Sequence, residues 1–306
     1  GAMITKFRGD LSLLEPGLRE FEKRTGVDML GVLPYDDPGL PEEDSLALPS
    51  TGERAVFGDD DGVDAAQSVT VGVPRLPRAS NVTDLEPLAA EPGVRVDYLP
   101  LNAVLKSVDA VVIPGTKNTV DDLLAMQDAG LDDRLRAFDG PIVGLCGGYQ
   151  ILGERIYKAD VEGTDIPEGT STVSAVGLLP VETTFSEDKR VVDTTLELDG
   201  TGPFAGVEGP VSGYEIHMGR TESTEAVETP FGRDGASTAA LGACRGRVVG
   251  CYLHGLFENS GLRDAFINSV YDAAGRQRPS GSVAAASPYD RAAALLAENS
   301  SLDWLD

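Results

Sequence analysis

The 306-residue sequence contains few of the residues that build metal and nucleic-acid sites. It has three cysteines and two histidines, without a CxxC or HxxxH pair, which disfavours a structural zinc site. Lysine occurs only six times, and Lys and Arg together number 25 against 50 acidic residues. Because phosphate binding needs clustered Lys and Arg, the net charge of −25 disfavours nucleic acid as a partner. The acidic residues are spread along the chain, as in adaptation to high salt.

Long apolar runs are missing too. No stretch approaches the length of a membrane-spanning helix and no signal peptide is visible, so we expect no membrane partner. An odd number of cysteines in a chain of this size fits a reducing compartment and predicts a cytoplasmic location. The hydrophobic content of 41% is sufficient for a substantial core.

One stretch that is present has the character of a reactive site. Ile142–Leu145 is an apolar run that leads directly into Cys146, and two glycines follow at once. A tight turn from strand to helix requires residues without side chains beside the reactive residue. The helix start offers free N–H groups and a partial positive charge, which favour a thiolate and a developing oxyanion. Cys146 is either a nucleophile or an ordinary core cysteine, and the pattern favours the nucleophile.

The order of apolar and polar segments predicts an α/β fold. Strands alternate with helices up to residue 156, which indicates a mostly parallel sheet flanked by helices, as in flavodoxin-like folds. The later strands are separated by Gly-rich or acidic turns and predict an antiparallel extension. Gly115 and Cys146 both end strands, so we expect them to meet at one sheet edge. Backbone N–H groups near Gly115 and Gly147 would then form an oxyanion hole.

Composition divides the chain into four segments. Residues 1–50 contain a strand, a helix and a strand without a Gly-rich phosphate loop, and residues 51–67 form an acidic linker. Residues 68–275 form the main domain, and residues 276–306 are a flexible segment followed by a helix. Gly1-Ala2-Met3 is either native or an added extension, and the sequence does not distinguish the two.

A reactive thiol needs a base, and a neighbouring imidazole is the usual one. His254 ends an apolar strand, as Cys146 does, and is the predicted base. His217 lies within the Gly-rich segment 212–221 and is expected to line the site. A carboxylate should orient the base, and Glu258, four residues after His254, is the first candidate, with Glu215 in the same region of the site.

Together these motifs resemble the class I glutamine amidotransferases and, within them, the cobyric acid synthase family of cobalamin biosynthesis. The resemblance extends over nearly the whole chain to about residue 272. It is carried by KFRGD at 6–10, LGVLPY at 30–35, EEDS at 42–45, PGTKNT at 114–119, LCGGYQ at 145–150, SGYEIHMGRT at 212–221 and YLHGLF at 252–257.

The resemblance implies a reaction and a set of residues. L-glutamine is hydrolysed to glutamate and ammonia through a thioester on Cys146, with His254 as the base. By the same motifs, Gln150, Tyr214 and His217 are expected to line the glutamine site.

The third member of the triad stays open at this point. Most of the superfamily has a glutamate two residues after the histidine, where this sequence has Leu256. The cobyric acid synthases are similar in lacking that glutamate, so the assignment of Glu258 rests on triad logic alone.

The resemblance also implies a second half-reaction. In the family, ammonia passes to an ATP-dependent synthetase domain that amidates peripheral carboxylates of adenosylcobyrinic acid a,c-diamide. Residues 1–50 resemble the last part of that domain. We therefore expect ATP, Mg and the corrinoid substrate to belong to the complete enzyme, and this chain to bind no cofactor or metal and at most to hydrolyse glutamine.

Three alternatives remain open. Cobyrinic acid a,c-diamide synthase pairs the same two domain types, although the segments 6–10 and 212–217 favour the first assignment. The amidotransferase of cell-wall lipid II is disfavoured by residues 1–50. A non-catalytic module that only binds a partner stays possible because the usual glutamate after His254 is missing.

Overall fold

The computed structural model describes residues 1–36, 49–59, 61–166, 169–279 and 288–301. The chain forms two compact units, one made of residues 1–41 with 283–306 and the other of residues 42–282. The last helix, α7 (Pro288–Asn299), thus belongs to the unit that contains the start of the chain. None of the helices in the described ranges is long and apolar enough to span a membrane.

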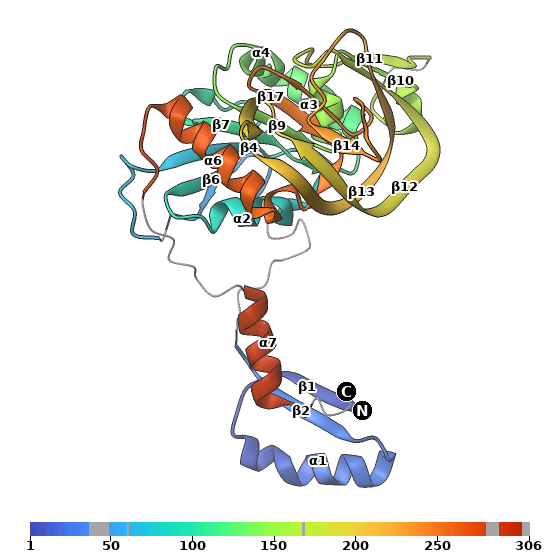
Figure 1. The fold of residues 1–306 in the computed structure, drawn as a ribbon. Coiled ribbons are helices and arrows are strands. Elements are labelled where there is room, and N and C mark those ends of the chain that lie inside the picture. The colour runs from blue at the N-terminus through green and yellow to red at the C-terminus, as the bar shows by residue number, and fades with distance from the viewer. Residues whose placement is uncertain (37–48, 60, 167–168, 280–287, 302–306) are drawn as a thin grey trace. The chain divides into compact units, whose positions relative to one another are not determined.

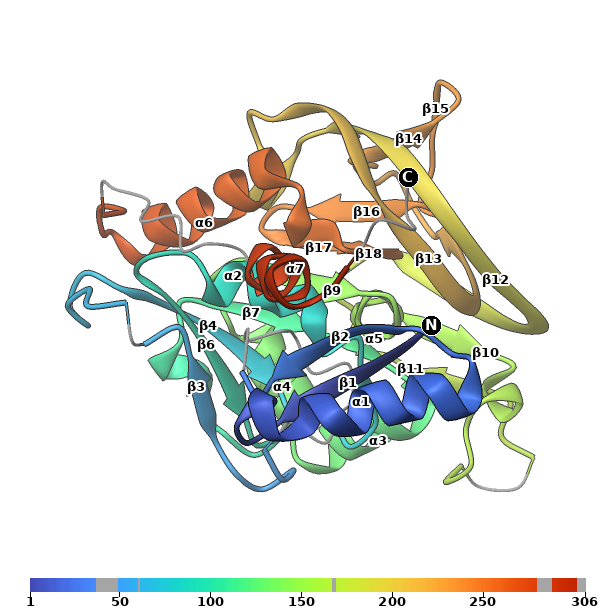
Figure 2. The ribbon, with the colours of Figure 1, turned by 90° about the horizontal axis from the view of Figure 1, so that it is seen from below.

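The first unit is built around a βαβ element, as the sequence predicts. Strand β1 (Ala2–Phe7) pairs in parallel with β2 (Met29–Pro34), and α1 (Leu11–Thr25) connects them (Figures 1 and 2). Helix α1 begins where the Asp10 carboxylate accepts a 2.9 Å hydrogen bond from the Ser12 N–H, and it ends at Gly26, whose φ of +70° is left-handed. After α7 the chain returns to β2, where the Ser301 N–H donates to the Leu30 carbonyl at 2.7 Å.

The second unit contains a seven-stranded sheet with the order β16-β17-β9-β7-β4-β6-β3. Its five central strands are parallel, and β16 and β3 pair antiparallel at the two edges. The strands, in sequence order, are β3 (Ala55–Phe57), β4 (Val69–Pro74), β6 (Val94–Leu99), β7 (Ala110–Ile113), β9 (Ile142–Leu145), β16 (Gly242–Arg245) and β17 (Val248–Cys251). The mostly parallel α/β sheet predicted from sequence is confirmed. Strand β3 lies within residues 51–67, for which the sequence predicts a linker.

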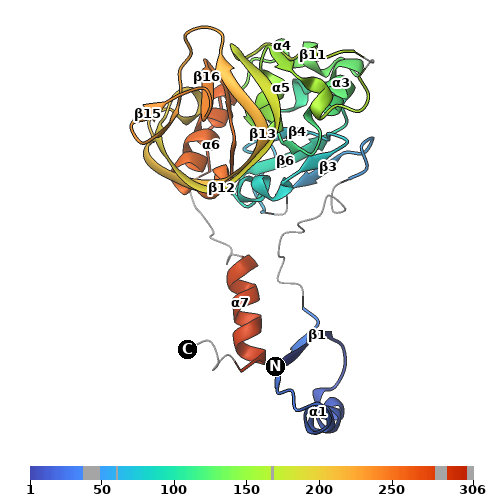
Figure 3. The same cartoon turned by 90° about the vertical axis from the view of Figure 1, so that its right-hand side faces the viewer.

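Helices cover both faces of this sheet. Helices α2 (Glu86–Ala89) and α6 (Ser260–Ala274) pack on one face, and α3 (Thr119–Asp128), α4 (Leu131–Arg136) and α5 (Gly147–Leu152) pack on the other (Figure 3). Successive strand residues point to opposite faces, so Val112 joins the core under α6 whereas Val111 joins the core under α3. Burial on both faces explains the continuous apolar runs of the parallel strands.

The predicted antiparallel extension is a second sheet, with the order β11-β10-β12-β13-β18, β14 beside β12 and β15 beside β14; its strand pairs are antiparallel except β10 with β12, which is parallel. Its centre is a long hairpin of β12 (Val181–Asp199) and β13 (Glu208–Ser223), visible in Figures 1 and 3. The other strands are β10 (Arg155–Tyr157), β11 (Thr172–Ser174), β14 (Phe231–Arg233), β15 (Ala236–Ser237) and β18 (Leu253–His254). Because β18 pairs Tyr214 with His254, the hairpin reaches the carboxyl edge of the parallel sheet.

Short elements complete the unit near that edge. Strands β5 (Ala79–Ser80) and β8 (Gly115–Thr116) pair antiparallel. The short 3₁₀ helices are η2 (Val82–Leu85), η3 (Leu105–Ser107), η4 (Ala159–Val161), η5 (Gly202–Phe204) and η6 (Leu256–Glu258). Of these, η2 and η6 pack against each other and bring residues near 84 to residues near 255.

Candidate active site

Cys146 stands on a strained turn between β9 and α5. Its φ is +52° and its ψ is −108°, a backbone conformation that residues other than glycine seldom adopt. Its N–H donates to the Cys251 carbonyl at 2.8 Å, and its thiol donates to the Ile216 carbonyl at 3.4 Å. With 8% of its surface exposed, the residue is held on both sides while its sulfur stays at the carboxyl edge of the sheet.

The glycines around Cys146 allow this turn to close. A Cβ on Gly148 would lie 2.2 Å from the Ile113 carbonyl oxygen, and a Cβ on Gly144 would lie 2.6 Å from the Gly148 oxygen. Helix α5 can therefore start directly over β7 and β9 only because neither position carries a side chain. The start of the helix directly after Cys146 places free N–H groups and a partial positive charge next to this residue, which favours negative charge there.

His254 and Asp84 form a buried hydrogen-bonded pair. The His254 Nδ1 lies 2.6 Å from the Asp84 Oδ2, and the Gly255 N–H donates to the other carboxylate oxygen at 2.8 Å. The imidazole is fully buried and the aspartate is 4% exposed. The two contacts fix the ring plane and leave Nε2 on the side away from Asp84.

The environment of His254 favours its protonated form. Burial opposes the charge, but the hydrogen bond to the Asp84 carboxylate, its negative charge and the nearby Cys146 sulfur outweigh burial and raise the pKa of His254 to about 10. Nε2 has no partner of full hydrogen-bond geometry among the described residues, although Cys146 is close enough to contribute to this shift. The Tyr214 ring stacks on the imidazole with centroids 5.0 Å apart.

Gly115, Thr116 and Gly147 come together beside Cys146. A Cβ on Gly115 would lie 3.1 Å from the His254 Cε1, so a side chain there would crowd the imidazole. A Cβ on Gly147 would lie 2.6 Å from the Thr116 Cγ2 and 3.3 Å from the Thr116 nitrogen. The backbone at 115–116 and the start of α5 are thus neighbours. Their role as an oxyanion hole stays a prediction.

Gln150 and His217 lie deeper in the same region. The buried Gln150 accepts from the Thr119 hydroxyl at 2.9 Å and donates to the Tyr252 hydroxyl at 3.2 Å. The His217 ring stacks on the Tyr252 ring at 3.7 Å, and its Nδ1 lies 2.7 Å from the Gly219 carbonyl. Both side chains are therefore engaged with protein groups around the thiol.

The structure places Asp84, and not Glu258, against His254. Glu258 is exposed, and no hydrogen bond of its carboxylate occurs in the described part of the chain. Glu215 is buried, but it binds Arg190 at 2.6 Å, Arg233, and His217 at 3.5 Å. Spacing from His254 fails to identify Asp84 because 170 residues separate the two. The available signal is an aspartate between the apolar residues Val82 and Leu85.

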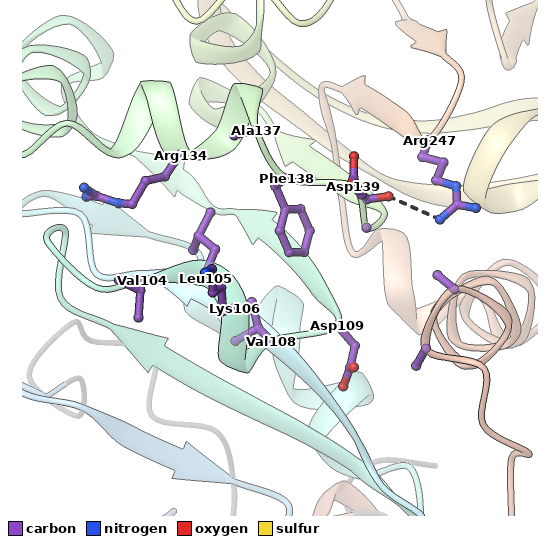
Figure 4. A pocket seen from close by; sticks show the side chains of 13 residues that line it. Val104, Leu105, Lys106, Val108, Asp109, Arg134, Ala137, Phe138, Asp139 and Arg247 are labelled. Atoms are coloured by element: carbon purple, nitrogen blue, oxygen red, sulfur yellow. Dashed lines mark hydrogen bonds between the residues drawn. The ribbon is translucent and has the colours of Figure 1, made fainter.

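One hollow of about 590 Å³ is not part of this arrangement. Its lining includes residues that precede strands of the parallel sheet, among them Asp109, Phe138 and Arg247 (Figure 4). It therefore lies at the amino edge of the parallel sheet, opposite the edge that carries Cys146. No group of three or more His, Cys, Asp or Glu side chains suited to a metal ion occurs among the described residues.

A thiol, an imidazole and a carboxylate in this order can perform acyl transfer. The imidazole can move a proton between the thiol and a leaving nitrogen, and the carboxylate fixes its orientation. Backbone N–H groups at 115–116 and at the start of α5 can stabilise a tetrahedral oxyanion.

Comparison with known proteins identifies the family. Residues 70–262 match the CobB/CobQ-like glutamine amidotransferase domain, and the chain belongs to this family. It is 56% identical over its whole length to a "probable cobyric acid synthase" of Halobacterium salinarum, and 40% identical over 98% of its length to one of Methanosarcina barkeri. In both cases the chain spans 58% of the relative's length.

Solved structures show weaker likeness. A glutamine amidotransferase from Thermotoga maritima aligns with 76% of this chain and 91% of its own, at 12% identity and a TM-score of 0.42. This score is too low to add to the family assignment made from sequence.

Proposed function

We propose that this chain hydrolyses L-glutamine and releases ammonia. The Cys146 sulfur attacks the side-chain carbonyl carbon of glutamine and forms a tetrahedral oxyanion. The imidazolium of His254 gives its proton to the amide nitrogen, and ammonia leaves a thioester on Cys146. His254 then takes a proton from water, which attacks the thioester, and glutamate departs as the thiol is restored.

One observation supports this proposal above all. His254 is bound by Asp84 and lies near Cys146, which stands on a strained turn at the start of a helix. The buried contact to Asp84 supports an orienting carboxylate for His254, whose apparent absence from the sequence kept a non-catalytic module possible. Backbone N–H groups at 115–116 and Gly147 are assigned to the oxyanion, and Gln150, Tyr214 and His217 to the walls of the glutamine site.

The test is glutaminase activity of the purified chain with and without Cys146→Ser. We expect release of glutamate that depends on Cys146. We also expect an electrophilic glutamine analogue to label Cys146, and an excess of glutamine to prevent this labelling. Equal rates for the two proteins would remove Cys146 from the reaction and would favour a module that only binds a partner.

We infer further that the complete protein is a cobyric acid synthase. The relatives of that name are longer than this chain, which leaves room in them for an ATP-dependent synthetase domain. ATP, Mg and the corrinoid carboxylates are assigned to that domain. Residues 1–41 with 283–306 are assigned to the same domain, because this unit has a sheet of only two strands and leaves apolar side chains exposed, such as Leu13 on α1 and Tyr35 after β2.

The corresponding test uses the full-length protein. ATP-dependent amidation of adenosylcobyrinic acid a,c-diamide by the full-length protein, and none by this chain alone, is the expected result. A full-length protein that amidated only the a and c carboxylates of cobyrinic acid would instead support the diamide synthase.

A further inference from the structure

The side chain of Thr116 lies between the proposed oxyanion site and a buried aspartate. Its methyl group packs against Gly147, where an added Cβ would lie 2.6 Å from it. On the other side, its hydroxyl donates to the Asp122 Oδ2 at 2.5 Å. Asp122 lies in the first turn of α3 and is fully buried.

The same carboxylate also holds the strand that faces Thr116. The Arg78 N–H donates to the Asp122 Oδ2 at 3.1 Å, and the Arg78 guanidinium lies 3.4 Å from the Oδ1. The Arg78 carbonyl in turn accepts from the Lys117 N–H at 3.0 Å. Asp122 thus joins β5 and β8 at one end of their ladder, where Ala79 pairs with Thr116.

We infer that Asp122 is a positioning residue for the oxyanion hole: through Thr116 it fixes the backbone at 115–116 against Gly147. This inference rests on the proposed function, because it concerns the backbone donors assigned there. A hydrogen bond that stabilises a transition state is effective only when its donor is held in place before the reaction. Thr116 has no other buried carboxylate partner among the described residues.

The neighbouring Asp121 offers a matched control. It is also buried in the first turn of α3, and it also approaches Arg78, at 3.2 Å. Its hydrogen bonds go to Thr164, Asp165 and Asn118, and none goes to Thr116. Substitution of either aspartate would therefore loosen α3 in general, whereas only substitution of Asp122 removes the hydrogen bond to Thr116.

The experiment compares Asp122→Ala and Thr116→Val with Asp121→Ala. Two conservative variants, Asp122→Asn and Thr116→Ser, keep an acceptor for Thr116 and a hydroxyl for Asp122. Each protein is assayed for glutaminase kcat and KM, and for the rate at which iodoacetamide alkylates Cys146. Alkylation is a displacement at a saturated carbon and forms no oxyanion. Its rate therefore measures the reactivity of the Cys146 thiol independently of the oxyanion hole.

We expect Asp122→Ala and Thr116→Val to lower kcat about 10-fold or more, with KM and the alkylation rate within about twofold of the parent. The Asn and Ser variants should recover most of the activity, and Asp121→Ala should keep kcat within about threefold of the parent.

An unchanged kcat in Thr116→Val would overturn the inference, as would a loss of the alkylation rate that parallels the loss of kcat. Thr116→Val preserves side-chain volume, so it decides the matter even if Asp122→Ala does not fold. Failure of the proposed function would look different, because the unsubstituted chain would then show no Cys146-dependent activity.

Discussion

The Asp84 Oδ2 lies 2.6 Å from the His254 Nδ1, and neither residue is more than 4% exposed. The carboxylate comes from a 3₁₀ helix near the start of the second unit, and the imidazole comes from a strand near its end. The triad that the resemblance implies has a glutamate two residues after the histidine, where this chain has Leu256. Here the same role is open to a residue from another element, because η2 and η6 pack together.

Removal of the Asp84 carboxylate should disable the base. In Asp84→Ala, the His254 ring loses the contact that sets its orientation and stabilises its positive charge, so we expect kcat to fall about 100-fold or more. Glu258→Gln is the matched control, because Glu258 is the carboxylate close in sequence and is exposed. It should stay within about twofold of the parent. The reverse ranking in a steady-state glutaminase assay would restore Glu258 as the orienting residue.

The same pair predicts how stability changes with pH. The pKa of His254 is raised from 6.5 to about 10 in the folded chain, so folding favours the protonated ring. The stabilisation is fully present below pH 6.5 and is lost as the pH rises toward 10. The free energy of unfolding should therefore decline over this range, by at most about 1.4 kcal/mol per pH unit from this group.

Asp84→Asn isolates this contribution. The amide removes the charge that holds the proton on His254, and other titrating groups are common to both proteins. Urea unfolding across the range should show a shallower decline for Asp84→Asn than for the parent. Identical slopes would mean that His254 does not gain a proton on folding.

The sequence predicts the residues at the reactive edge of the sheet better than it predicts the residues that hold them in position. Cys146 follows β9, and His254 comes three residues after the end of β17, so the rule that parallel strands share a carboxyl edge brings the two regions together, although His254 itself belongs to β18 of the second sheet. Asp84 escapes this reasoning because a tertiary contact between two short 3₁₀ helices leaves no periodicity in the sequence. Asn118 illustrates the same limit on a smaller scale: its side chain caps α3 through the Asp121 N–H, although the adjacent Thr119 is also a residue type that commonly caps helices.

The antiparallel extension shows a different limit. Residues 176–185 and 191–198 read as two strands divided by a charged segment, but β12 runs without a break from Val181 to Asp199. A shift of register between Phe185 and Arg190 absorbs the interruption, since both flanks stay paired with β13. Pairing with a long partner strand overrides local polarity, and the local sequence does not contain that information.

The close contact of α5 with β7 predicts a strict requirement for glycine at position 148. In Gly148→Ala the new methyl group would lie 2.2 Å from the Ile113 carbonyl oxygen, which is backbone and cannot move aside cheaply. We expect a loss of about 2 to 4 kcal/mol in the free energy of unfolding, together with loss of glutaminase activity. Gly52→Ala is the control, because nothing lies within 4 Å of a Cβ there. Thermal and urea unfolding would separate the two, and equal stabilities would contradict the close packing of α5.

The buried Glu215 should be needed for stability at neutral pH. Burial raises its pKa, but hydrogen bonds from His217, Arg233 and Arg190 outweigh burial and lower the pKa from 4.5 to about 2. Glu215→Gln leaves Arg190 and Arg233 without their shared carboxylate, so we expect a loss of about 2 to 3 kcal/mol in the free energy of unfolding near pH 7, within what the shift in pKa allows.

The acid range gives this prediction its sharper form. A carboxylate with a lowered pKa stabilises the fold above pH 4.5, and this contribution disappears as the pH falls toward 2. The stabilities of Glu215→Gln and the parent should therefore converge in that range. Glu222→Gln, which alters an exposed glutamate on the same strand, should follow the parent throughout. A constant difference between Glu215→Gln and the parent down to pH 2 would show that the side chain acts through packing, because the ionised carboxylate would then contribute nothing.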